Sequence, residues 1–192
     1  KKMEVRVLAP DINKSSSTFT PEGKNVRFGL SAIKNVGENI VGAIIETRNQ
    51  IGEFTSFENF IGSVKHKDLN KKSLESMIKC GALDSFGIER NQLLANIEDI
   101  TKYAQASRKE SDASQSGLFG VSFKSTAKPK ALVLKPAEPA TPADKLLWEK
   151  ELLGLYVSEH PLTYAKEKMS AMKPTLIKSV LAERSNIHAY RI

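Results

Sequence analysis

The sequence predicts a mainly α-helical protein that contains a tandem helix–hairpin–helix domain, a small N-terminal β-ribbon, a flexible tether and a C-terminal helical segment. Three observations lead to this prediction. Apolar residues recur at helical spacing from residue 31 to residue 106, and two glycines 44 positions apart, Gly37 and Gly81, interrupt that pattern with turns. A polar stretch rich in proline then separates the pattern from one further apolar helix.

The composition of the 192 residues excludes several classes of protein. The chain has no run of about eighteen apolar residues, which excludes a membrane span, and no basic-then-apolar leader, which excludes a secretory signal. We therefore expect a soluble, intracellular protein. Its single cysteine, Cys80, excludes an internal disulfide framework and a cysteine-rich zinc site, and the three histidines lie too far apart to indicate a metal centre. The formal net charge of +7 favours an anionic partner such as nucleic acid.

Residues 1–30 are expected to form short β-strands. Apolar and polar side chains alternate over residues 3–7 and again over residues 26–30, which is the period-two pattern of half-buried strands. Between them, Pro10, Pro21 and Gly23 are typical of a loop. We expect the two alternating stretches to pair as an antiparallel ribbon.

Residues 31–106 carry the helical periodicity of the predicted domain. Thr55, followed by Glu58 three positions later, has the pattern of a capping box and is expected to open a short helix. A helix is also expected to begin at Glu89, with an apolar face that continues to Ala104. The remaining apolar positions predict one helix through residues 40–45 that ends near Gly52, and one through residues 74–78 that stops at Gly81.

Residues 107–140 are predicted to be a flexible tether, because Ser, Asp, Lys and Glu dominate their start and four of the eight prolines fall between positions 129 and 142. Regular structure returns at Thr141 and Pro142, an N-cap residue and a first-turn proline that open the helical segment 141–192. Glu149, Glu151 and Glu159 are expected to be exposed helix charges. Neither end of the chain carries a capping or turn signal, so we expect a fragment of a longer protein.

The tight turn at residues 33–38 has the spacing of a helix–hairpin–helix unit. Such a hairpin presents backbone N–H groups at the start of its second helix, where the helix dipole also favours an anion such as a phosphate. Gly37 would allow close approach of a phosphate, with a positive φ if the turn needs one. A second, looser unit surrounds Gly81. The alternative for each glycine is an ordinary helix C-cap, and both interpretations stay open at this point.

Lysines crowd the approach to the second turn. Residues 61–79 carry five lysines against two acids, a cluster that would release counterions from DNA and make binding salt-dependent. A solvated lysine face is the alternative explanation. The candidate DNA contacts are Lys34, Asn35, Val36, Gly37, Lys65, Lys67, Lys79, Gly81, Ala82 and Arg90. No catalytic residue and no metal ligand is predicted.

Three separated blocks of the sequence resemble the bacterial DNA polymerase III alpha subunit, the C-family replicative polymerase. They are VRFGLSAIKNVGE at residues 26–38, LESMIKCGALDSFG at 74–87 and WEKELLGLYVSEHPL at 148–162. The resemblance implies that residues 1–30 end a fingers region, that 31–106 form the tandem DNA-binding domain, and that 141–192 lead into a truncated oligonucleotide-binding (OB) fold. Asn35 departs from the family's pattern, which has a glycine there, although asparagine tolerates the left-handed conformation better than most residues.

The resemblance also carries expectations about activity. The parent would be a DNA-directed DNA polymerase, a nucleotidyltransferase that uses Mg²⁺ bound by carboxylates of a palm region. That region is absent here, so we expect this chain to be inactive alone and to need no cofactor. The expected partners are primer–template duplex DNA, the sliding clamp (beta subunit) and other replicase subunits, with no membrane, in the bacterial cytoplasm.

One apolar island interrupts the tether at residues 115–120. Leu118 and Phe119 have no neighbours at helical or strand spacing, and exposed apolar residues in a flexible peptide are typical of a docking motif. Gln115 would bond at the rim of the partner's pocket, and Gly120 completes the Gln-x-x-Leu-Phe-Gly pattern that the resemblance identifies as a clamp-binding motif. Folding back onto the domain is the alternative. Two other classes of protein remain open: a standalone nucleic-acid-binding adaptor that recruits a partner through residues 115–120, and an enzyme whose active site is not evident.

Overall fold

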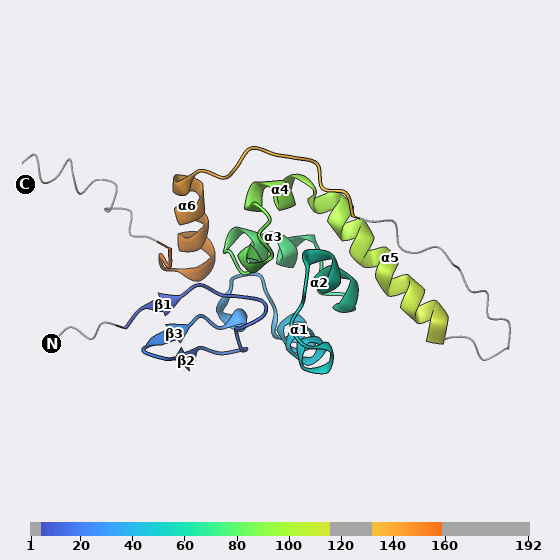
Figure 1. Ribbon diagram of the computed structural model, residues 1–192, viewed down its shortest axis with the longest axis horizontal. Coiled ribbons are helices and arrows are strands. Elements are labelled where there is room, and N and C mark those ends of the chain that lie inside the picture. The colour runs from blue at the N-terminus through green and yellow to red at the C-terminus, as the bar shows by residue number, and fades with distance from the viewer. Residues whose placement is uncertain (1–4, 116–131, 159–192) are drawn as a thin grey trace, which may run out of the picture. The chain divides into compact units, whose positions relative to one another are not determined.

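The computed structural model describes residues 5–115 and 132–158 (Figure 1). Within these ranges the chain forms six α-helices, two short 3₁₀ helices and one three-stranded sheet near the N-terminus. The predicted mainly α-helical fold class with a small N-terminal sheet is therefore confirmed. The described residues up to Val157 belong to one compact unit. None of the described helices is long and apolar enough to cross a membrane.

The sheet differs from the predicted ribbon in the direction of its strands. Its order is β1-β3-β2, and β1 runs parallel to β3, with Val7 opposite Val26. The antiparallel ribbon expected from these two stretches is wrong: the antiparallel partner of β3 is β2, which lies in the expected loop. Gly23, at φ +60°, allows the tight turn between β2 and β3, whereas the longer connection after β1 brings the chain back in the same direction. The strands are β1 (Val7–Leu8), β2 (Thr20–Glu22) and β3 (Asn25–Arg27).

The first four helical elements follow in order after the sheet. The short helix α2 is capped by Ser56, whose side chain accepts a bond from the Asn59 N–H, and not by the expected pair of Thr55 and Glu58. A Ser side chain at this position reaches the third backbone N–H of the helix, so the prediction missed the cap by one residue. The elements are η1 (Leu30–Ala32), α1 (Glu38–Ile51), α2 (Phe57–Ser63) and α3 (Lys71–Lys79).

The helix expected from Glu89 to Ala104 is divided in two at Asn96. The second part, α5, then continues to Gln115, beyond the expected end of the domain at residue 106. Residues 105–115 contain neither glycine nor proline, so their polar side chains are compatible with a helix that is already nucleated by its apolar face. The elements are η2 (Asp84–Phe86), α4 (Arg90–Ala95) and α5 (Ile97–Gln115).

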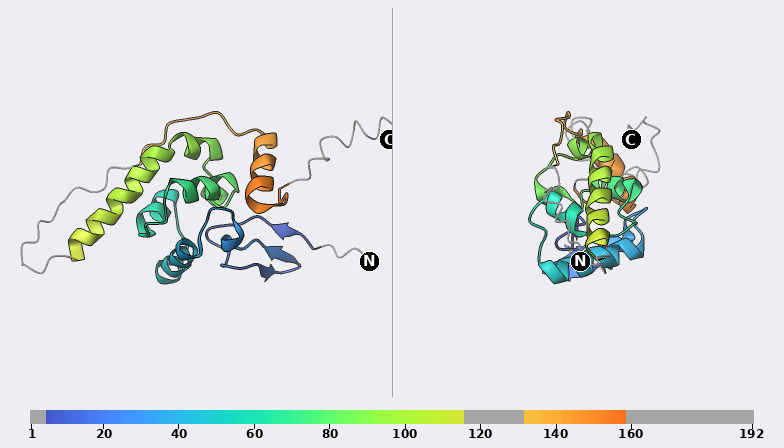
Figure 2. Two further views of the ribbon diagram at one scale, coloured as in Figure 1. Left: turned by 180° about the vertical axis from the view of Figure 1, so that it is seen from behind. Right: turned by 90° about the vertical axis from the view of Figure 1, so that its right-hand side faces the viewer.

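The second part of the expected tether, residues 132–140, is extended but packed on the domain. Lys135 donates its N–H to the side chain of Asn96 at 3.0 Å, and the Asn96 amide donates back to the Lys135 carbonyl at 2.9 Å. Leu132 and Leu134 pack against the core. Figure 2 shows this segment passing from the start of α5 beside α4 to the last helix. The prediction failed here because the alternating leucines supply burial that the proline-rich composition conceals.

The last described helix, α6 (Pro142–Leu153), confirms its predicted start and end. The Thr141 hydroxyl accepts a bond from the Asp144 N–H, the Asp144 carboxylate accepts from the Thr141 N–H, and Gly154 ends the helix at φ +76°. Leu152 and Leu153 belong to the main hydrophobic core, so α6 packs on the helix–hairpin–helix domain instead of forming a separate block. The expected boundary at residues 140/141 therefore does not separate two cores, and residues beyond 158 lie outside the described part.

Candidate nucleic-acid interface

The first hairpin joins η1 to α1 through residues 33–37. Val36 is 5% exposed and anchors the turn in the core, and its N–H donates to the Ile33 carbonyl. Asn35 has the left-handed φ of 66°, whereas Gly37 has φ −76°. Gly37 therefore does not use a positive φ, and the asparagine that departs from the family's pattern is the residue that turns the chain. Its amide nitrogen also lies 3.3 Å from the Ser76 hydroxyl and donates a bond that fixes the turn against α3.

The N-terminus of α1 is open. Gly37 is its N-cap and supplies no side-chain cap. A Cβ at Gly37 would meet no atom within 4 Å, so the space on the side-chain side of this N-cap residue is unobstructed. The first backbone N–H groups of a helix lack partners within the helix and carry its positive dipole end, which together favour an anion. Glu38, in the first turn, places a negative charge at the same end.

Lys34 contributes its side chain but not its backbone N–H. That N–H donates to the Leu152 carbonyl of α6 at 3.0 Å, whereas the Lys34 side chain is exposed. The surface of the first hairpin is therefore formed by the Lys34 side chain, the left-handed Asn35 and the N-cap Gly37.

The second turn, after α3, is a helix C-cap. Gly81 has φ +84° and donates its N–H to Ile78, while the Ala82 N–H donates to the Met77 carbonyl at 3.0 Å. These two bonds define a Schellman motif, so the C-cap alternative holds for this glycine. Gly81 and Ala82 are both buried, and neither presents its backbone to a phosphate.

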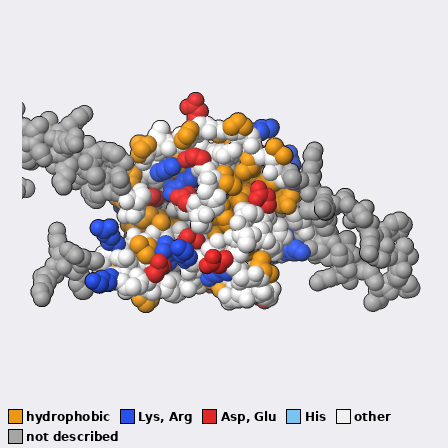
Figure 3. Space-filling model, viewed as in Figure 1, with side chains coloured by type: hydrophobic (Ala, Val, Ile, Leu, Met, Phe, Trp, Pro, Cys, Tyr) orange, Lys and Arg blue, Asp and Glu red, His pale blue; other side chains and the backbone are white. Residues whose placement is uncertain are grey.

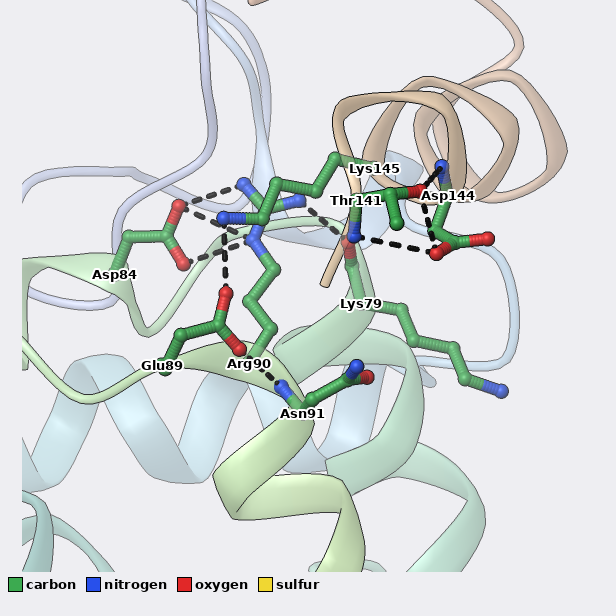
Figure 4. Close-up of polar contacts among 8 residues, drawn as sticks. All are labelled: Lys79, Asp84, Glu89, Arg90, Asn91, Thr141, Asp144 and Lys145. Carbon is green, nitrogen blue, oxygen red and sulfur yellow. Dashed lines mark hydrogen bonds and ion pairs between the residues drawn. The ribbon is translucent and has the colours of Figure 1, made fainter. Parts of the chain in front are cut away.

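The space over Gly81 is filled by the guanidinium group of Arg90. Arg90 is 7% exposed, and a Cβ at Gly81 would overlap its Nη2 atom. The guanidinium donates to both carboxylate oxygens of Asp84, with Nη2–Oδ2 at 2.6 Å, and through Nη1 to the Lys79 carbonyl at 2.9 Å (Figure 4). Burial lowers the pKa of Arg90, but bonding to Asp84 and the charges of Asp84 and Glu149 outweigh it and raise the pKa overall. Arg90, expected at the DNA, is bound inside the protein.

An acid–base network joins the second turn to α6. Lys145 forms an ion pair with Glu89 at 2.9 Å, and the other Glu89 oxygen caps α4 by accepting from the Asn91 N–H (Figure 4). Burial raises the pKa of Glu89. Lys145 and the N–H groups of Asn91 and Ala140 lower this pKa by a larger amount, so the net shift is downward. Glu149 is 1% exposed and accepts from the Val157 N–H, which shows that the expected exposure of Glu149 is wrong. The sequence does not predict this burial, because residues 141–192 were expected to form a block separate from the helix–hairpin–helix domain.

The lysines of residues 61–79 are distributed over several environments. Lys65 and Lys67 are exposed on the loop between α2 and α3, Lys71 pairs with Glu98 of α5, and Lys79 is half-buried. Arg108, a cation that the sequence analysis did not single out, donates from α5 to the His66 carbonyl on the same loop. On the face shown in Figure 3, acidic and basic side chains are intermingled, so the net charge does not appear there as one basic field.

The predicted clamp-binding motif, residues 115–120, falls mainly outside the described residues. Gln115 is the last residue of α5, and Leu118, Phe119 and Gly120 lie in the gap between the two described ranges. In the part of the chain that the structure describes, no three His, Cys, Asp or Glu side chains gather as a metal site would require.

Comparisons with known proteins match most of this chain to a segment of longer proteins. A family model described as a helix-hairpin-helix motif matches residues 4–93, which include both turns. DNA polymerase III subunit alpha of Mycobacterium tuberculosis (strain CDC 1551 / Oshkosh) is 37% identical over 183 residues, covering 94% of this chain and 16% of that protein. The subunits named in the same way from Deinococcus radiodurans and Thermus aquaticus are 41% and 40% identical, over 84% and 82% of this chain and 12% of each relative.

This chain is homologous to a segment of DNA polymerase III subunit alpha. It spans 12–16% of the length of these relatives. The resemblance noted in the sequence is thus confirmed as homology over most of the chain, with a helix–hairpin–helix region inside it. The activity and partners of the whole relatives are not contained in that match.

Proposed function

We propose that this chain is the duplex-DNA-binding and sliding-clamp-binding region of a bacterial DNA polymerase III alpha subunit. It would extend from the end of the fingers region to the start of the OB-fold, act in the cytoplasm with the other replicase subunits, and support processive DNA synthesis. The polymerase reaction and its Mg²⁺ ions would belong to the palm of the parent enzyme, and the segment itself would need no cofactor. The observation that carries the proposal is the open, uncapped N-terminus of α1 within a helix–hairpin–helix homologue of this subunit.

The first hairpin is the proposed phosphate-binding element. The N–H groups at the start of α1 would donate to a phosphate oxygen, and the exposed Lys34 side chain would add a positive charge beside them. Lys65 and Lys67, on the loop after α2, would contact further phosphates, with the half-buried Lys79 as a weaker candidate. Contacts of this kind position a duplex without reading its bases, so binding would show no sequence preference. The second turn takes no part, because Arg90 occupies it.

Two glycines, the N-cap Gly37 and Gly42 within α1, provide a matched test of the hairpin. Gly37→Ala places a methyl group beside the N–H groups while its φ of −76° suits alanine, so folding is retained and phosphate approach is hindered. We expect duplex affinity to fall severalfold. Gly42→Ala adds the same methyl group to an exposed position of the same helix, with open space around it, and should leave DNA binding unchanged. Equal affinities for the two variants would refute the role of the hairpin.

Salt dependence tests the electrostatic part of the proposal. Contacts to about three phosphates predict that log K falls against log salt with a slope of about −3. Duplexes of unrelated sequence should give the same slope and the same affinity. A flat salt dependence would contradict phosphate binding.

Clamp binding is tested by the paired change Leu118→Ala and Phe119→Ala. These two apolar side chains would fill a pocket on the clamp, so their loss should abolish clamp capture while duplex affinity stays the same. Unchanged clamp affinity would rule out residues 115–120 as the docking motif.

A further inference from the structure

We propose that α6 positions the first hairpin for DNA. The seat of α6 would be the second hairpin, residues 80–89 between α3 and α4 with the adjoining Arg90, and Glu149 would be the positioning residue. The DNA affinity of the first hairpin would then depend on whether α6 is seated. This inference rests on the proposed DNA-binding function and concerns the control of that same site.

The C-terminal end of α6 contacts the first hairpin directly. The Leu152 carbonyl accepts the Lys34 N–H at 3.0 Å, and Leu152 itself is 5% exposed in the core. Lys34 immediately precedes Asn35, whose φ of 66° is sparsely populated for residues other than glycine. Such a conformation persists when its surroundings fix it. The bond from α6 is one of those restraints, and the bond from Asn35 to Ser76 is another.

The second hairpin supplies the surface on which α6 is seated. Its turn is closed by Arg90, and α6 packs against α3, with Leu152 and Leu153 in the same core as Met77 and Ile78. The charge of Glu149 is also one cause of the raised pKa of Arg90. A carboxylate that is 1% exposed requires such compensation, because a buried, uncompensated charge is strongly destabilising. Glu149 also accepts the Val157 N–H at 2.9 Å, so it holds the chain that leaves α6 as well as the helix.

A second contact fixes the start of α6. Lys145, near the start of α6, pairs with Glu89 at 2.9 Å. The start of α6 is therefore tied to the second hairpin, whereas its last turn holds the first hairpin. The two hairpins have separate roles: one presents N–H groups to solvent, and the other binds the helix that holds the first in place.

Unseating α6 would have a defined effect on DNA binding. The Lys34 N–H would lose its acceptor, and the turn at Asn35 would adopt its left-handed conformation for a smaller fraction of the time. Apparent affinity falls in proportion to the competent fraction, so a hairpin that is competent a tenth of the time binds about ten times more weakly. Any event that pulls on the chain after Val157 would reach the first hairpin by this route.

The experiment compares two charge reversals on α6 in the full chain. Lys145→Glu opposes Glu89 and should unseat the helix. Lys150→Glu makes the same change of net charge at an exposed position whose lysine contacts the Gly154 carbonyl and the Tyr156 ring, both within α6 and the turn that follows it. Glu149→Ala is the third variant. Amide hydrogen exchange at Lys34 reports seating, and titration with a duplex of fixed length reports affinity.

We expect exchange at Lys34 to accelerate at least tenfold in Lys145→Glu and Glu149→Ala, with affinity reduced at least threefold beyond the Lys150→Glu control. If Glu149→Ala does not fold, Lys145→Glu alone decides. Unchanged exchange at Lys34 would overturn the seating of α6, and faster exchange with control-like affinity would overturn the coupling. Absence of duplex binding by the unmodified chain would instead refute the proposed function, and exchange at Lys34 would still test the contact with α6.

Discussion

Replacing Gly29 by alanine should destabilise the fold by steric overlap alone. Gly29 has φ −78° and ψ 142°, which alanine adopts without strain. Its Cβ would lie 2.5 Å from the Thr18 carbonyl carbon, 2.6 Å from the Ser17 oxygen and 2.8 Å from the Phe19 nitrogen. All three are backbone atoms, so no side-chain rotation relieves the overlap and the crossing loop must move.

The size of the effect follows from what that movement disturbs. Overpacking in a buried region costs about 1–3 kcal/mol. The loop also accepts the Leu30 N–H at Ser16 and the Ser31 N–H at Ser17, at 2.9 and 3.0 Å, and weakening each bond costs about 1 kcal/mol. We therefore expect a loss of about 3–5 kcal/mol in the free energy of unfolding. With a slope of about 2 kcal/mol/M, the urea midpoint falls by about 2 M.

Urea unfolding followed by circular dichroism measures this loss, with Gly42→Ala as the matched control. Gly42 lies within α1, exposed and with open space around it, so alanine should stabilise the protein by roughly 0.5–1 kcal/mol. The two substitutions have opposite expected signs. A loss below about 0.5 kcal/mol for Gly29→Ala would show that the loop does not cross at this glycine.

Three further predictions concern single ionisable groups. Burial raises the pKa of the Cys80 thiol to about 12, so alkylation at pH 8 should proceed only through opening of the fold, and a rate independent of urea would contradict this. The pKa of Glu89 lies below its ordinary value of 4.5, so the folded state binds fewer protons than the unfolded state near pH 4–5. The stability that Glu89 contributes is therefore complete above about pH 5 and is lost as the pH falls through the folded pKa. Between pH 7 and pH 3.5, the urea midpoint of the unmodified protein should decline more steeply than that of Lys145→Ala. Glu38→Gln removes a negative charge from the start of α1 and should tighten duplex binding about twofold. It should also reduce stability by about 0.3–1 kcal/mol, because the charge of Glu38 interacts favourably with the helix dipole. Weaker duplex binding in a filter or anisotropy assay would argue against a phosphate at this position.

Local signals in the sequence predicted the local structure well. The capping residues Thr141 and Asp144 and the glycine at 154 define α6 within a few neighbouring positions, and the structure places its ends accordingly. The turn at residues 33–38 was also recognisable, although the residue with the positive φ is Asn35 and not Gly37. The spacing of apolar residues identified the helices for the same reason: periodicity is a property of one continuous segment.

Pairings between distant segments were not predictable in the same way. The bond from Lys34 to Leu152 joins a backbone N–H to a backbone carbonyl, and neither group leaves a mark on residue identity. In the sequence, Arg90 resembles any other surface charge. Its partner Asp84 is set by the turn at Gly81 and not by helical spacing, so periodicity does not predict that Arg90 is buried. The parallel direction of β1 and β3 likewise depends on how the intervening loop travels, which strand periodicity does not encode.

The paired bonds between Asn96 and Lys135 have a consequence for the position of α6. Lys135 is bonded to Asn96, the residue just before α5 begins. Because these bonds fix the chain at Lys135, the position at which α6 starts does not depend on the number of residues between the end of α5 and Lys135. The place of α6 on the domain is accordingly set from Lys135 onward, by bonds within the part of the chain that the structure describes.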